Sequence, residues 1–397
     1  MLLSVVFSEN NAYGGGGMAN YFNSSPLLFQ VAFSNNSARF GGGMNNYFSS
    51  NPFLLQVSFE NNEASYDGGG IYNDTNCNLE LFNTSFISNS AIRNGGGFYS
   101  DEICTTLIVN STFSGNDANG GGGIYNSGES HSSITFSTLS ENDNAAICNL
   151  NSSIRLSNSI VWGNAGGSII NLEDSTVSVE YSDIEGELYA GTGNISEDPL
   201  LGPLDYYNGI SRLYALQVGS PAIDSANPEL YFSTDQRGFE RAIDGDNDSF
   251  AIADMGSYEY GSYLGEYSLD VSVNGNGNVA KNPEQTTYSY GEIVILDAIP
   301  APGWSFSSWG GDYLFSRNPL YKFMINDSEI TANFTQDEYS LNITVNPVEG
   351  GSVEVSPQQP MYYYDDHVTL TPQAAPGWIF DHWSGDVSDT QVPLELT

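Results

Sequence analysis

Residues 33–43 read Phe-Ser-Asn-Asn-Ser-Ala-Arg-Phe-Gly-Gly-Gly, and this stretch decides the fold because the chain repeats it. The shared pattern is a phenylalanine, an asparagine three residues later, an alanine two residues further on, and then a run of glycines. Copies follow each other at 26 or 27 residues from Phe7 to Phe113, and weaker copies at Leu139 and Val161 follow after 26 and 22 residues. A fixed period in the twenties indicates a solenoid, in which each repeat is one turn that buries its apolar face against its neighbours.

The repeated positions predict ladders of like side chains along the solenoid axis. The phenylalanine column is Phe7, Phe33, Phe59, Phe86 and Phe113, and the asparagine column is Asn10, Asn36, Asn62, Asn89, Asn116, Asn142 and Asn164. Stacked phenylalanines form an apolar core, whereas asparagine tolerates left-handed backbone and bonds to neighbouring turns. Glycine supplies positive φ at the sharp corner. The short apolar runs between these columns favour strands.

These features predict an all-β fold, a right-handed parallel β-helix, over residues 1–170. A leucine-rich repeat is the rival at this period, but its L-x-x-L-x-L frame is missing. The pair of motifs, F-x-x-N with a glycine run before an apolar residue, resembles the repeats of polymorphic outer-membrane proteins. It reads Gly69-Gly70-Ile71, Gly96-Gly97-Phe98 and Gly122-Gly123-Ile124, with a third glycine where that family usually has alanine. The resemblance implies a β-helix and, as an expectation, an adhesive role.

The charge balance is strongly acidic. Nine Lys and Arg stand against 48 Asp and Glu, so the formal net charge is −39. Such a field repels phosphate backbones and excludes nucleic-acid binding as a main role. No apolar run approaches the roughly 20 residues of a membrane helix. Residues 1–7 fit the repeat frame and lack the basic start and cleavage site of a signal peptide, so we expect an export signal further upstream.

Two of the three cysteines occupy one column of the repeat. Cys77 and Cys104 each lie seven residues after the last glycine of their turn. Stacked strands are about 4.8 Å apart, a separation that a disulfide can span. We therefore expect a disulfide in an exported protein, with two stacked free thiols as the alternative. Cys148 is expected to be a buried, small apolar residue.

Residues 171–262 lose the period and carry different phrases. They include Gly219-Ser-Pro-Ala-Ile-Asp224, Thr234-Asp-Gln-Arg-Gly-Phe239 and Ala253-Asp-Met-Gly-Ser-Tyr-Glu-Tyr260. Their succession over about 156–260 resembles the choice-of-anchor type Q region of bacterial surface proteins. The resemblance implies a segment that closes the β-helix in a secreted or surface protein.

Residues 265–335 and 338–397 form a second, longer repeat. Glu266-Tyr-Ser-Leu in the first copy corresponds to Glu338-Tyr-Ser-Leu in the second, and Ala301-Pro-Gly-Trp304 corresponds to Ala375-Pro-Gly-Trp378. Each copy resembles the divergent internalin-type B-repeat, a small β module of bacterial surface proteins. The second copy stops before the strand that matches Ile330–Phe334, so we expect it to be truncated.

One loop has the composition of a calcium site. Asp244, Asp246 and Asp248 alternate along the chain, and Asp254 follows. Calcium prefers six to eight hard oxygens, and alternating carboxylates can wrap around one cation. The spacing differs from that of an EF-hand, because position 12 of the loop is Met255. Two interpretations stay open, namely a calcium loop and a polar turn whose carboxylates face water.

The expected function is non-catalytic. The regular turns carry only Arg39, Arg93 and Arg155 as strong bases, and no column stacks carboxylates over several turns, as a lyase or glycosidase groove would need. We expect a monomeric protein, extracellular or on the bacterial surface and outer-membrane associated, which contacts glycans or surface proteins. The alternatives are a polysaccharide lyase or glycosidase whose catalytic turns lie upstream, and a purely structural spacer.

Overall fold

The structure, a computed structural model, describes residues 1–186, 188–230, 232–263, 265–312 and 314–397. It divides the chain into two compact units, Met1–Gly265 and Glu266–Thr397. Strands dominate both units, and the one helical element among the described residues is the 3-10 turn η1 (Val348–Gly350). None of the described helical segments is long and apolar enough to cross a membrane.

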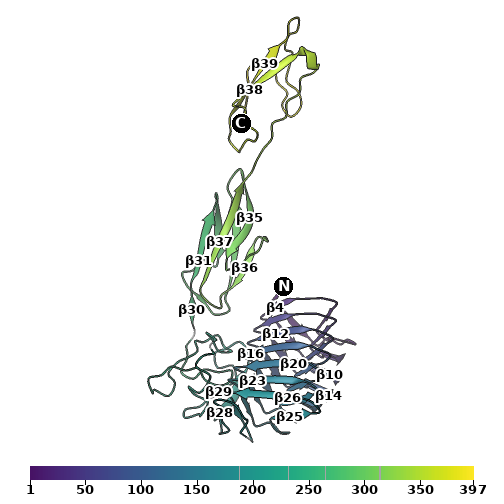
Figure 1. The fold of residues 1–397 in the computed structure, drawn as a ribbon, viewed down its shortest axis with the longest axis vertical. Helices are drawn as coiled ribbons and strands as arrows, with labels where there is room; N and C mark the ends of the chain where they lie inside the picture. Colours follow the sequence, from purple (N-terminus) through teal and green to yellow (C-terminus); the bar gives the residue numbers. More distant parts are fainter. Residues whose placement is uncertain (187, 231, 264, 313) are drawn as a thin grey trace. The chain divides into compact units, whose positions relative to one another are not determined.

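The first unit is a parallel β-helix, which confirms the fold class. Its strands stack in successive turns from purple to teal in Figure 1. Four parallel sheets, here called A to D, run along it. Sheet A comprises β1 (Leu2–Leu3), β4 (Leu27–Phe29), β8 (Phe53–Leu55), β12 (Asn78–Phe82), β16 (Thr105–Val109), β20 (His131–Thr135), β23 (Ser153–Ser157) and β26 (Thr176–Glu180).

The other three sheets complete each turn. Sheet B comprises β2 (Val6–Ser8), β5 (Ala32–Ser34), β9 (Ser58–Glu60), β13 (Ser85–Ile87), β17 (Thr112–Ser114), β21 (Thr138–Ser140), β24 (Ile160–Trp162) and β27 (Asp183–Ile184). Sheet C comprises β6 (Ser37–Phe40), β10 (Glu63–Asp67), β14 (Ser90–Asn94) and β18 (Asp117–Gly120). Sheet D comprises β3 (Met18–Tyr21), β7 (Met44–Tyr47), β11 (Ile71–Asp74), β15 (Phe98–Ser100), β19 (Ile124–Asn126), β22 (Ile147–Leu150) and β25 (Ile169–Leu172).

The phenylalanine column forms a stack inside the β-helix. Strand pairing in sheet B puts Phe33 directly opposite Phe59, and the same register continues to Phe113. Ring centroids of successive phenylalanines from Phe7 onward are 4.5–5.0 Å apart, with interplanar angles of 2–9°. Offset stacking of buried rings contributes about 0.5–1.5 kcal/mol per pair beyond the area that it buries. This stack and the aliphatic residues around it form the main core.

The asparagine column satisfies the backbone at the corner after sheet B. Asn62 is typical: its backbone and side-chain amides both donate to Asn89 Oδ1, at 3.0 and 2.9 Å. Its Nδ2 also donates to the carbonyl oxygen of Phe33 in the preceding turn, at 2.9 Å. The same bonds recur from Asn10 to Asn164. A buried corner without such partners would leave costly unpaired backbone groups.

Three successive glycines are needed because each meets a different restriction. Gly41 has a φ of +64°, which favours glycine. A Cβ on Gly42 would lie 2.5 Å from the backbone oxygen of Gly69 in the next turn. A Cβ on Gly43 would lie 2.7 Å from the Phe59 ring. The third glycine has no side chain and therefore leaves space for the ring of the phenylalanine stack.

The β-helix extends beyond residue 170, where the sequence analysis ended it. β26 and β27 continue sheets A and B for another turn, and the segment 189–196 then covers that turn. The amide of Tyr181 donates to Thr192 O, and that of Ile184 donates to Ile195 O. Residues 200–262, which include the antiparallel pair β28 (Leu201–Asp205) and β29 (Leu213–Leu216), pack against the side of earlier turns.

The second unit contains the two predicted modules. The first has one sheet of β31 (Leu269–Asn274), β37 (Ser328–Gln336) and β35 (Trp304–Gly311), another of β32 (Gly277–Asn282), β34 (Ile293–Pro300) and β36 (Leu320–Phe323), and the small pair β30 (Glu266–Tyr267) and β33 (Tyr288–Ser289). The second has a single sheet of β38 (Gly351–Ser356), β39 (Val368–Ala374) and β40 (Leu394–Leu396).

Candidate functional site

A groove of about 520 Å³ runs across the outer face of sheet A, over the five strands from β12 to β26. Because side chains alternate along a strand, every second residue of these strands faces outward. One outward column reads Asn78, Thr105, His131, Ser153 and Thr176, and the other reads Glu80, Leu107, Ser133, Arg155 and Ser178. The groove therefore presents rows of polar groups at the spacing of the turns.

The polar groups of the groove are tied to each other along the rows. Thr105 Oγ1 donates to Asn78 Oδ1, and His131 Nδ1 lies within hydrogen-bond distance of Ser153 Oγ. Among the residues that line the groove, Glu80 is the single carboxylate. Arg155 pairs at 3.3 Å with Glu180, at the other end of the neighbouring strand. The groove thus offers hydroxyl, amide, imidazole and guanidinium groups to a ligand.

A buried ionic network joins residues 200–262 to the β-helix. Arg237 donates through Nε and Nη2 to Asp235 Oδ2, at 2.8 and 2.6 Å, and its guanidinium lies 3.8 Å from the Tyr258 ring centroid. Arg241 pairs with Glu259 at 3.2 Å, and both side chains are fully buried. Burial raises the pKa of Glu259, although Arg241 opposes that rise. The network is therefore a set of buried and closely paired charges. Removal of one partner from such a pair is costly, because the other charge stays buried.

The β-helix supplies polar partners to this network from its corner between sheets A and B. Asn110 Nδ2 donates to Thr234 O at 2.8 Å, and Asn110 Oδ1 accepts from Arg241. Thr112 Oγ1 donates to Gln236 Oε1 at 2.6 Å. Apolar contacts accompany these bonds, because Phe136 and Ile160 of the β-helix pack with Leu216, Ala222 and Met255. Residues 200–262 thus cover the side of the β-helix, in addition to the capping of its last turn by residues 189–196.

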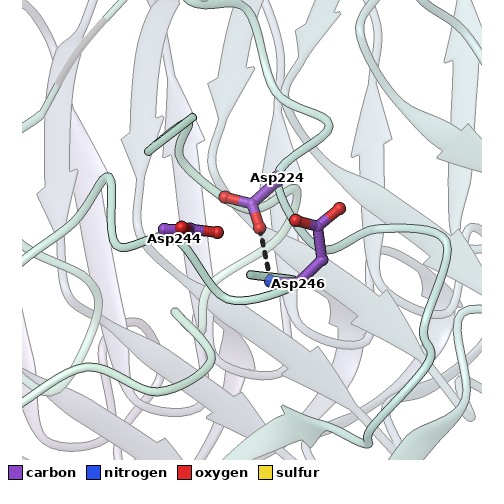
Figure 2. Close-up of side chains that lie close together, drawn as sticks. All are labelled: Asp224, Asp244 and Asp246. Carbon is purple, nitrogen blue, oxygen red and sulfur yellow. Dashed lines mark hydrogen bonds between the residues drawn. The ribbon is translucent and has the colours of Figure 1, made fainter. Parts of the chain in front are cut away.

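Three carboxylates meet at the outer part of this region, as Figure 2 shows. Asp224 lies in one loop, and Asp244 and Asp246 lie in another; one oxygen of each is within 4.8 Å of the others. Asp224 Oδ2 accepts from the amides of Gly245 and Asp246, both at 2.9 Å, which holds the two loops together. Burial raises the pKa of Asp224. Oxygen ligands of this kind suit calcium, and among the described residues these three form the group that could hold it.

The structure changes the predicted ligand set of this loop. Asp248 is exposed and accepts from the amide of Phe250, outside the cluster. Asp254 is fully buried, and its two oxygens accept from the amides of Asp224 and Tyr260. Burial raises the pKa of Asp254 well above its usual range. Asp254 therefore belongs to the buried network. Asp224, which was not among the predicted ligands, is instead the third carboxylate of the cluster.

The cysteine column holds free thiols where the sequence predicted a disulfide. Cys77, Cys104 and Cys148 are all buried and unbridged. The sulfur of Cys104 accepts from the backbone amide of Cys77 at 3.2 Å, and the sulfur of Cys77 accepts from that of Ser50. Ser130 Oγ makes the same bond to the amide of Cys104. The column therefore uses small side chains to satisfy the backbone of the preceding turn.

The sequence contains one further indication of the buried ionic network, which lies in the spacing of its basic residues. Arg237 and Arg241 are two of only nine basic residues in an acidic chain, and they lie four residues apart. Basic residues so rare and so clustered indicate paired carboxylates nearby. No comparable signal marked Asp224, because the partner loop lies about 20 residues further along the chain.

Comparisons with known families agree with this architecture. Residues 56–74 match the Chlamydia polymorphic membrane protein repeat, and residues 267–338 and 341–396 match the divergent InlB B-repeat domain. No curated protein and no solved structure matches the chain. These matches confirm the two resemblances and indicate a bacterial surface protein with a β-helix. The resemblance of residues 156–260 to a choice-of-anchor region stays a prediction.

Proposed function

We propose that this chain is a non-catalytic, ligand-contacting part of a bacterial surface protein, and that the groove on sheet A binds a neutral glycan. The observation that supports the proposal is the polar lining of the groove, with an outward hydroxyl or amide group on each of five stacked strands. A polysaccharide laid along the axis would meet at least one polar side chain at each turn.

Two further features support a neutral ligand and a binding role. The net charge of −39 disfavours acidic polysaccharides, which would be repelled before contact. Hydrolysis of a glycoside usually needs two carboxylates that flank the scissile bond, and Glu80 is the single carboxylate of the lining. A protein ligand on the bacterial or host surface is the remaining candidate, because the same polar groups can bond to a peptide.

The test measures retention of the whole chain on neutral and acidic polysaccharides, together with new reducing or unsaturated ends. Ser133→Met places a larger side chain in the groove and should abolish retention. Glu63→Met, on the exposed face of sheet C, is the matched control and should leave retention intact. New ends would overturn the non-catalytic proposal. Equal retention by both variants would show that the ligand binds elsewhere, and no retention at all would favour a protein ligand or a spacer.

A further inference from the structure

The outer face of sheet C carries a group of aromatic and arginine side chains, here called the sheet C patch. It consists of Arg39 and Phe40 on β6, Tyr66 on β10 and Arg93 on β14. The Cζ atoms of Arg39 and Arg93 lie 4.1 and 4.7 Å from the centroid of the Tyr66 ring, and the centroid of the Phe40 ring lies 5.4 Å from it. Arg93 is exposed, and the other three residues are half-buried. The patch is therefore one continuous surface, and each of its three turns has a neighbouring turn on both sides.

Among the described residues, Arg39 is the one arginine of the first unit without a carboxylate partner. The unit contains six basic residues, all of which are arginines. Glu63 is exposed on the same face of sheet C, yet it forms no ion pair with Arg39. The five other arginines form ion pairs, namely Arg93 with Asp67, Arg155 with Glu180, Arg212 with Glu60, Arg237 with Asp235 and Arg241 with Glu259.

The guanidinium group of Arg39 keeps most of its donors free. Its Nη1 donates to Tyr13 Oη at 3.1 Å, whereas its buried Nε has no hydrogen-bond partner among the described residues. A guanidinium has five N–H donors around its edge, and contact with an aromatic ring uses its flat face. The position of Arg39 over Tyr66 therefore leaves donors at the edge for a bound carboxylate.

Arg93 and Asp67 hold the ring on which Arg39 rests. Arg93 Nη2 pairs with Asp67, whose side chain is 2% exposed, and Asn94 Nδ2 donates to the same carboxylate at 3.0 Å. The charge of Asp67 is thus balanced within the β-helix. The guanidinium of Arg93 is attracted to the Tyr66 ring, which restricts the movement of that ring. The patch is consequently preorganised before any partner binds.

The composition and charge of the patch indicate the class of partner. Tyrosine, phenylalanine and arginine are enriched at protein interfaces and among the residues that contribute most to binding. An acidic polysaccharide also carries carboxylates, but it is a polyanion, and the net charge of −39 repels it. A second copy of the chain is repelled for the same reason. A protein that presents a carboxylate on a surface without net negative charge avoids this repulsion.

We propose that the sheet C patch binds a partner protein that is neutral or basic overall and that places an aspartate or glutamate against the guanidinium of Arg39. The planar guanidinium and a carboxylate form two parallel hydrogen bonds, which fixes the orientation of the partner. Apolar residues beside that carboxylate would contact the rings of Tyr66 and Phe40. This site lies on a different sheet from the groove of sheet A, so it does not depend on the proposed glycan.

The first test selects a displayed library of random peptides on the whole chain and discards the peptides that also bind Arg39→Gln. We expect the retained peptides to carry Asp or Glu beside an apolar residue. Each should bind the unmodified chain at least about tenfold more tightly than Arg39→Gln, a difference typical of a central interface residue. Arg155→Gln, on sheet A, is the matched control and should bind like the unmodified chain. Failure to obtain peptides that distinguish Arg39→Gln would overturn the proposal.

A second test checks that the contact is a guanidinium–carboxylate pair. Asp→Asn or Glu→Gln in a selected peptide should weaken binding to the unmodified chain and have little further effect on binding to Arg39→Gln. Arg39→Lys keeps the charge but loses the planar set of donors, so it should also bind weakly. The melting temperatures of both variants should stay unchanged, because Arg39 forms no ion pair within the chain. Equal binding by Arg39→Lys and the unmodified chain would contradict the pairing.

Two other ligands of the patch would be recognised by separate measurements. Retention of an acidic polysaccharide that Arg39→Gln abolishes would assign the patch to a glycan and overturn the proposal. Concentration-dependent dimers that Arg39→Gln abolishes would assign it to a second copy and likewise overturn the proposal. Sedimentation of the chain alone, at several concentrations, measures the second outcome.

Discussion

Arg241 and Asn110, which are 131 residues apart in the chain, are joined by a buried hydrogen bond of 3.2 Å from Nη2 to Oδ1. The same guanidinium pairs with Glu259 and lies 4.5 Å from the Phe136 ring centroid. It therefore contacts both the β-helix and the region that covers its side. This contact makes Arg241 the residue most suited to a test of how the two parts are held together.

Arg241→Met should loosen residues 200–262 from the β-helix. Removal of one partner from a buried ion pair costs about 3–5 kcal/mol, because Glu259 stays buried without its counter-charge. Urea unfolding and limited proteolysis of residues 200–262 measure the effect. Arg155→Met is the matched control, since its pair with Glu180 is exposed and worth at most about 1 kcal/mol. Equal losses in both variants would contradict a special role for the buried pair.

Asn89→Ala should strongly destabilise the β-helix. The side chain of Asn89 donates to Phe59 O and Asn116 Oδ1 and accepts from the two amides of Asn62. Each buried group left unpaired costs about 1–3 kcal/mol. We expect a loss of more than about 3 kcal/mol in denaturant unfolding, on the same scale.

Asn11→Ala is the control for this ladder. Asn11 donates to Ser37 Oγ at 2.8 Å in an exposed position, where water can replace the lost partner. Its substitution should cost less than about 1 kcal/mol. A similar result for Asn11 and Asn89 would mean that the ladder is not a major source of stability.

Asp183 should make stability fall as pH rises. Burial raises the pKa of Asp183 from 3.8 to about 7, and its Oδ2 has no hydrogen-bond partner. Because the folded state keeps a proton that the unfolded state releases, this contribution is fully present below pH 3.8 and is lost as pH rises to about 7. The loss is about 1.4 kcal/mol per pH unit within that interval.

Asp183→Asn removes the titrating group and should flatten this pH dependence. The free energy of unfolding of the variant, relative to that of the unmodified chain, should therefore increase between pH 4 and 7. Denaturant unfolding at several pH values measures it. A difference that stays constant with pH would show that Asp183 is ionised in the folded protein.

The cysteines should titrate as three free thiols. Because the structure has no bridge between Cys77 and Cys104, reaction with a thiol reagent in denaturant should reveal three groups per chain. Reaction of the folded protein should be slow, since all three are buried. A count of one would restore the disulfide that the sequence predicted.

Calcium binding can be tested at the cluster of Asp224, Asp244 and Asp246. If calcium binds, it should raise the melting temperature by mass action, and chelation should reverse the rise. Asp244→Asn should abolish the effect because Asp244 belongs to the three-carboxylate cluster. Asp248→Asn should preserve it, since Asp248 lies outside that cluster. Loss of the effect in both Asp244→Asn and Asp248→Asn would favour the linear loop over the cluster.

Much of the fold could be predicted because its contacts are periodic. Phe33 meets Phe59, and Asn36 meets Asn62, each one turn further along the chain. A contact repeated at one sequence separation leaves a repeated pattern of residues, which needs no knowledge of distant segments. The disulfide predicted between Cys77 and Cys104 is absent from the structure for a chemical reason. A shared column shows that two side chains are close, but a thiol can accept a hydrogen bond from a backbone amide instead of forming a bridge.

The candidate sites were predicted less completely because they combine segments without periodicity. The sequence placed Asp248 and Asp254 beside Asp244, whereas folding brings Asp224 to Asp244 and buries Asp254 near Glu259. The groove on sheet A arises from outward residues of five strands, and no single stretch of sequence records it.

The sequence by itself determined the parallel β-helix, its side-chain ladders and the two repeated modules, because each follows from a local pattern that recurs at a regular interval. Only the tertiary structure decided that residues 200–262 lie along the side of the β-helix, and which carboxylates meet there. Those contacts, such as that of Arg241 with Asn110, occur once and across more than a hundred residues. Their energy depends on burial and pairing that only the folded chain creates.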